Sequence, residues 1–67
     1  MDGHSKDLIV QLCTRAAMIM EDVSPLALGI GTRDPAATVV ALQDLARAGD
    51  TIAALVRAAR LLAGHPN

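Results

Sequence analysis

The sequence predicts a small all-α domain of three helices that completes its core as a helical homodimer. Apolar types make up 52% of the 67 residues, yet Phe, Tyr and Trp are absent. Such an aliphatic, alanine-rich composition favours helices and offers no aromatic platform for stacking bases and no large aromatic anchor for a partner. The apolar residues recur at helical spacing, and Gly, Pro and Asp stand where helices begin and end.

The first helix is expected over about residues 5–23. Ser5 is a suitable N-cap, and Asp7 is well placed for the positive end of the helix dipole. At about 100° per residue, the apolar side chains fill an arc of roughly 200°. An ordinary surface helix needs an apolar stripe only somewhat wider than about 100°, so this helix is expected to contact two neighbours. The arc consists of Leu8, Ile9, Val10, Leu12, Cys13, Ala16, Ala17, Ile19, Met20 and Val23.

Residues 24–34 are interpreted as a connection. Ser24-Pro25 disfavours continuation of the helix, and Gly29-Ile30-Gly31 supplies two flexible positions. The glycines do not make a dinucleotide site, because no strand precedes them and the third glycine of that motif is missing. Leu26, Leu28 and Ile30 make the connection apolar, so it is expected to fold over one end of the bundle.

The second helix is expected over about residues 35–48. Asp34 is a good N-cap, and Pro35 suits the first helical position because its fixed φ fits and its missing amide is not needed there. The core stripe of this helix is predicted to be Val39, Leu42, Leu45 and Ala46, with Val40 on the polar side.

Gly49-Asp50 is interpreted as a helix stop followed at once by a new N-cap, which gives a tight corner between helices two and three. The third helix is expected over about residues 51–63 and ends at Gly64 and Pro66. One of its faces holds Ile52, Leu55, Val56, Ala59, Leu62 and Ala63. A smaller second face holds Ala54, Ala58 and Leu61.

The expectation of a dimer comes from chain size. For a chain this short, the free energy gained by burial and the entropy lost on ordering nearly cancel, and Cys13 alone cannot form an internal disulfide. Two apolar surfaces, on helix one and helix three, exceed what a three-helix monomer can cover, and a two-fold dimer would pair them. The candidate interface residues are Ile9, Val10, Cys13, Ala17, Met20, Leu26, Leu28, Ile30, Ala54, Ala58 and Leu61.

Charge and hydropathy predict a cytoplasmic protein. The net charge is -1, and neither half of the chain is polybasic. Charges interrupt every apolar stretch, so no segment approaches the roughly 20 apolar residues of a membrane span. The N-terminus has neither the basic start nor the continuous apolar stretch of a signal peptide. The Ala and Arg usage suggests a bacterial-type cytoplasm.

No catalytic, metal-binding or cofactor-binding residues are expected, and no small-molecule ligand is evident. Cys13, His4 and His65 are possible metal donors, but no two of them are spaced as a ligand pair. As a nucleophile, Cys13 would be hidden inside the first helix's apolar arc. The adjacent carboxylates Glu21 and Asp22 point about 100° apart on a helix, so they do not face a common substrate. An enzyme is therefore not expected.

The function expected from these features is a non-catalytic helical module for protein–protein interaction or regulation that self-associates. One alternative is a small DNA-binding regulator that uses helices two and three as a helix-turn-helix-like unit. Its contacts would come from Arg47, Thr51, Arg57 and Arg60, a set poor in groups that discriminate bases. A second alternative is a helical subunit that completes the bundle of a larger complex.

Overall fold

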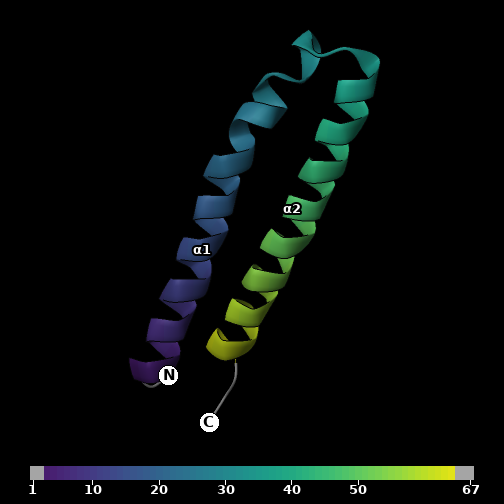
Figure 1. The fold of residues 1–67 in the computed structure, drawn as a ribbon. Coiled ribbons are helices and arrows are strands. Elements are labelled where there is room, and N and C mark those ends of the chain that lie inside the picture. The colour runs from purple at the N-terminus through teal and green to yellow at the C-terminus, as the bar shows by residue number, and fades with distance from the viewer. Residues whose placement is uncertain (1–2, 65–67) are drawn as a thin grey trace.

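The computed structural model describes residues 3–64 and forms one antiparallel helical hairpin (Figure 1). Helix α1 (Gly3–Leu28) leads through a short 3-10 turn, η1 (Ile30–Thr32), into helix α2 (Pro35–Ala63). The Cα trace measures 52 × 15 × 11 Å along its principal axes. The prediction of an all-α fold is confirmed, but the described chain contains two long helices where three were expected.

The predicted corner at Gly49-Asp50 is wrong, because α2 continues through both residues. No described glycine has a positive φ, so Gly49 does not adopt the left-handed conformation that ends many helices. A glycine inside a helix costs only about 1 kcal/mol relative to alanine. Half-buried or buried side chains continue at helical spacing on both sides of it, through Leu45, Ala48 and Ile52. Breaking the helix there would interrupt this contact with α1, which outweighs the glycine cost.

Both predicted ends of the first helix are also wrong. The helix α1 begins at Gly3, so Ser5 lies inside it and is not its N-cap, and it runs through Pro25 to Leu28. Proline lacks an amide, but only one further turn follows it. Two donors from residues after the helix stabilise that last turn. The Gly29 amide donates to the Pro25 carbonyl at 3.0 Å, and the Arg33 guanidinium donates to the Leu26 carbonyl at 2.9 Å. These bonds satisfy carbonyls that every helix end leaves without an intrahelical donor.

The start of α2 agrees with the prediction. The Asp34 carboxylate accepts a 2.8 Å hydrogen bond from the Ala37 amide, and Pro35 is the first helical residue. The Thr38 hydroxyl donates to the Asp34 carbonyl at 2.8 Å, which fixes the first turn from its other side. At the far end, the Gly64 amide donates to the Arg60 carbonyl at 2.8 Å, as expected for a helix that ends at residue 63.

A single seam of side chains holds the two helices together. The seam residues are buried or half-buried and lie three or four positions apart, the spacing of a coiled coil. Only three hydrophobic side chains of the described residues are buried, and all are alanines: Ala16, Ala41 and Ala59. The seam comprises Ser5, Leu8, Leu12, Ala16, Ile19, Val23 and Leu26 of α1 and Thr38, Ala41, Leu45, Ala48, Ile52, Leu55, Ala59 and Leu62 of α2.

The core predicted for residues 35–48 is wrong in three of its four positions. Val39 is 54% exposed and Leu42 is 53% exposed, and Ala46 is exposed as well. The true seam includes Leu45 but runs through Ala41, which the pattern of larger side chains did not single out. The prediction chose the largest apolar side chains of residues 35–48 as the core. This segment is too short for its apolar spacing to show which side of the helix faces α1.

Candidate functional site

The two long sides of the hairpin differ in chemistry. The helices are right-handed and antiparallel, so along one viewing direction α1 turns clockwise and α2 turns counter-clockwise. In each helix, the residue that follows a seam residue projects about 100° further round the helix axis. Because the helices are antiparallel, these following residues lie on the same side of the hairpin in both helices. Side chains about 100° before the seam share the opposite side.

The first side carries no charged residue along its middle, and we call it the uncharged face. Its larger side chains are well exposed: Met20 is 49% exposed, Leu42 53% and Val56 40%. Between them lie small side chains that are also exposed. The uncharged face comprises Cys13, Ala17 and Met20 of α1, with half-buried Ile9 at its edge, and Leu42, Ala46, Gly49, Ala53 and Val56 of α2.

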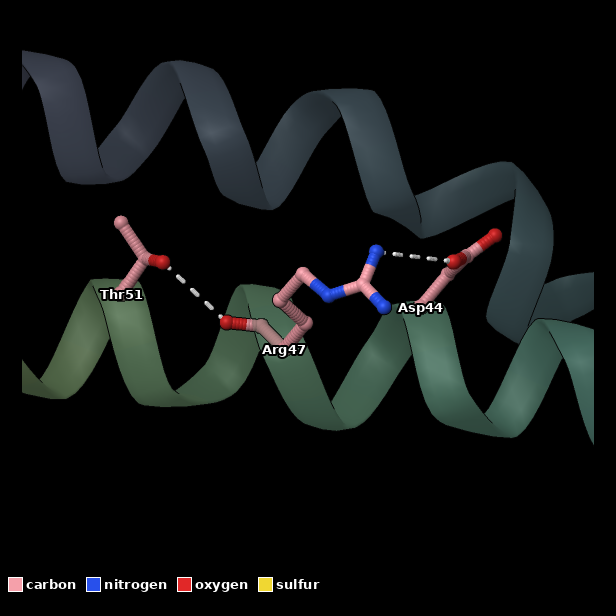
Figure 2. A network of polar contacts seen from close by, with 3 residues as sticks. All are labelled: Asp44, Arg47 and Thr51. Atoms are coloured by element: carbon pink, nitrogen blue, oxygen red, sulfur yellow. Dashed lines mark hydrogen bonds and ion pairs between the residues drawn. The ribbon is translucent and has the colours of Figure 1, made fainter.

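The opposite side mixes charged, polar and apolar residues, and we call it the mixed face. It comprises Gln11, Arg15, Met18 and Asp22 of α1 and Val40, Asp44, Arg47, Thr51, Ala54, Ala58 and Leu61 of α2. Figure 2 shows three of these side chains in a row along α2. The Thr51 hydroxyl donates to the Arg47 carbonyl at 3.1 Å, and Arg47 Nη1 lies 3.7 Å from Asp44 Oδ1. With side chains 79% and 46% exposed, this ion pair is of the weak surface kind.

The predicted interface residues fall into separate groups. Three of those from the first helix, Cys13, Ala17 and Met20, lie together on the uncharged face, with half-buried Ile9 at its edge, whereas Val10 lies on the side of α1 that is turned away from α2. The strip predicted from the third helix, Ala54, Ala58 and Leu61, lies on the mixed face, with Ala58 half-buried and Leu61 67% exposed. At the turn, Leu26 and Ile30 are half-buried, whereas Leu28 is 84% exposed.

The helix α2 half of the uncharged face was missed by the sequence prediction. Leu42, Ala46 and Val56 were assigned to the core, and Gly49 was assigned to a corner. The signal that finds them is a spacing of alternately four and three residues from position 42 to position 56, which requires Gly49 to be helical. A corner at Gly49 hides that periodicity.

The residues proposed for DNA contact do not form a common surface. Arg47 and Thr51 lie on the mixed face, Arg57 points away from α1, and Arg60 lies at the open end beyond the uncharged face. The corner that would have made a helix-turn-helix is part of a continuous helix. Neither the spacing nor the turn expected for that unit is present among the described residues.

His4 and Cys13, two of the metal donors considered above, lie nine residues apart on α1. The expectation that Cys13 is hidden is wrong, because its side chain is exposed. Within residues 3–64, no three His, Cys, Asp or Glu side chains are grouped so that they could hold a metal ion, and no pocket is present. His65 lies outside the described residues. In the same part of the chain, neither helix has a stretch long and apolar enough to cross a membrane.

Comparison of the chain with protein-family models, with curated proteins and with solved structures finds no match. The arrangement of the two faces is therefore the basis for a functional proposal.

Proposed function

We propose that this protein is a non-catalytic helical interaction module that self-associates through an exposed side of its hairpin. The observation that carries the proposal is the uncharged face, which spans both helices of a hairpin whose buried hydrophobic residues, over residues 3–64, are three alanines. A contiguous exposed apolar patch is typical of an interaction site, whereas scattered apolar residues are not. Association would supply the apolar burial that the isolated hairpin does not have.

The accessible surface of the chain supports this proposal. It amounts to 5001 Å² for a chain of 6.9 kDa. A compact monomer of that mass has about 4000 Å² by the usual scaling of surface with mass. The excess of about 1000 Å² accompanies the elongated shape of the hairpin, whose Cα trace measures 52 × 15 × 11 Å. Each partner in a standard protein interface buries roughly 800 Å², so the chain exposes enough surface to form one.

A cytoplasmic location is part of the same proposal and depends on the charges that interrupt every apolar stretch of the sequence.

Sedimentation equilibrium on the purified chain tests self-association. A dimer at micromolar concentration should give about twice the monomer mass of 6.9 kDa, and dilution should reduce both the apparent mass and the melting temperature together. A folded monomer with a concentration-independent melting temperature would refute self-association. If such a monomer is recovered from the native cell bound to one larger protein at fixed stoichiometry, the chain is a subunit of that complex instead.

A further inference from the structure

We infer that a second copy of this chain packs on the uncharged face with its long axis reversed, so that α1 lies against α1 and α2 against α2 in a four-helix bundle. This inference rests on the proposed self-association and specifies its surface and its orientation. Three observations carry it: the environment of Gly49, the distribution of charge along the hairpin, and the surface excess described above.

Gly49 has no role within its own chain. It is the middle residue of α2 (Pro35–Ala63), where glycine costs about 1 kcal/mol relative to alanine. Its φ is not positive, and a Cβ added there would meet no atom within 4 Å. Nothing in the hairpin therefore requires the absence of a side chain. A second helix that crosses α2 closely at this point would require it, because two backbones approach most closely where side chains are smallest.

The neighbours of Gly49 on the uncharged face fit such a crossing. Ala46 and Ala53 flank it on the same side of α2, and the larger Leu42 and Val56 follow on either side. Small residues at the centre and larger ones toward the ends give the α2 part of this face a shape that can pack against a reversed copy of itself. With the two-fold axis at Gly49, each Leu42 would approach the Val56 of the second copy, because both lie seven residues from the axis.

Charge along the hairpin selects the orientation. The half near the turn, residues 17–47, carries four acids and two bases: Glu21, Asp22, Asp34 and Asp44 with Arg33 and Arg47. The described part of the open half carries four bases and two acids: Lys6, Arg15, Arg57 and Arg60 with Asp7 and Asp50. Four of these charges, Arg15, Asp22, Asp44 and Arg47, lie on the mixed face, away from the second copy. The others leave two acids and one base near the turn and three bases and two acids in the open half, so a second copy with reversed long axis still places each half over the half of opposite net charge. A parallel copy would place like charges together, which is unfavourable.

A pair of adjacent alanines gives a matched test of the surface. Ala53 lies on the uncharged face and Ala54 on the mixed face, and both are exposed in the hairpin. Glutamate at either position has the same helix propensity and the same charge, so the two variants differ in which face carries the carboxylate. We expect Ala53→Glu to weaken the dimer at least tenfold, measured by sedimentation equilibrium, and Ala54→Glu to change its dissociation constant less than threefold.

The alternative results each have a defined meaning. If Ala53→Glu loses its helical circular dichroism while Ala54→Glu remains a folded dimer, the inferred face is supported, because folding then depends on association at that face. If Ala54→Glu dissociates the dimer and Ala53→Glu does not, self-association stands but the inferred face is wrong. If the unmodified chain is a folded monomer at micromolar concentration, the proposed function itself is refuted, and this inference with it.

The orientation is tested by the distance between spin labels. A single label on His4→Cys, in a Cys13→Ser background, lies about 12 residues from the middle of α1. At a rise of 1.5 Å per residue, reversed copies separate the two labels by at least about 35 Å. Parallel copies hold them at the same height, about 20 Å apart across the bundle. A distance near the larger value supports the reversed arrangement, and one near the smaller value overturns it.

Discussion

Replacement of Arg33 by methionine should destabilise the hairpin through the turn. Arg33 Nη1 donates to the Leu26 carbonyl at 2.9 Å, and this contact is partly buried. Hydrogen bonds to charged groups contribute about 1.5–3 kcal/mol, and partial exposure places this one near the lower value, about 1.5 kcal/mol. Methionine retains much of the apolar stem but cannot donate. The Leu26 carbonyl, near the end of α1, would then depend on water.

Thermal unfolding followed by circular dichroism measures the effect. For a domain of this size, 1 kcal/mol corresponds to about 4–8 °C, so Arg33→Met should lower the melting temperature by about 6–12 °C at fixed protein concentration. Arg57→Met is the matched control: it removes an exposed arginine from the C-terminal half of α2 and should change stability by less than about 0.5 kcal/mol. Equal melting temperatures for the two variants would show that the guanidinium contact does not stabilise the turn.

A double-mutant cycle tests whether Gly29 makes room for the Arg33 guanidinium. A Cβ on Gly29 would lie 3.1 Å from Arg33 Nη1 and 3.2 Å from the Pro25 carbonyl oxygen. Gly29→Ala should therefore displace the guanidinium and destabilise the chain. In the Arg33→Met background the same change should cost less, because one of the two close contacts is then absent. Strictly additive effects would contradict the idea that Gly29 makes room for Arg33.

Three further predictions concern α2. Asp34→Ala removes the 2.8 Å cap to the Ala37 amide and should cost about 1 kcal/mol, measured by urea unfolding; a loss below about 0.3 kcal/mol would contradict the capping role. Gly49→Ala should raise the stability of the helix by up to about 1 kcal/mol but weaken the dimer. The gain in melting temperature should therefore be smallest at high protein concentration, where the dimer is populated. An equal gain at all protein concentrations would contradict close packing at Gly49. Asp44→Asn removes only an exposed 3.7 Å ion pair and should change stability by less than about 0.5 kcal/mol at physiological salt; a larger loss would show that the pair is stronger than its exposure implies.

The parts of the fold that depend on short-range hydrogen bonds could be predicted from the sequence. Asp34 with Pro35 identifies the start of α2, and the end at residue 63 is correct, because in both cases the partners lie within four residues. The end of α1 could not be predicted in this way. It extends past Pro25 with the help of Arg33, whose guanidinium caps a carbonyl seven residues away.

Gly49-Asp50 shows why the candidate surface could not be recovered from local signals. Each residue has an ordinary explanation as a helix stop and a new cap, and together they predict a corner. The seam between α1 and α2 continues across them, and this longer-range contact determines the structure. Once the helix is continuous, positions 42 to 56 form one side of it, and the uncharged face extends over both helices.

The glycine that misled the sequence prediction then becomes an indication of a partner. Gly49 destabilises its own helix, and no contact within the chain requires a glycine there. Such a residue is expected where a contact with another molecule requires it. At Gly49 that contact fits a second backbone, because an added Cβ would find open space in the hairpin and the flanking side chains are also small. If the contact is removed by dissociation, alanine at this position should be better than glycine. The sign of the Gly49→Ala effect as a function of protein concentration therefore distinguishes a glycine retained for close helix packing from one that has no such role.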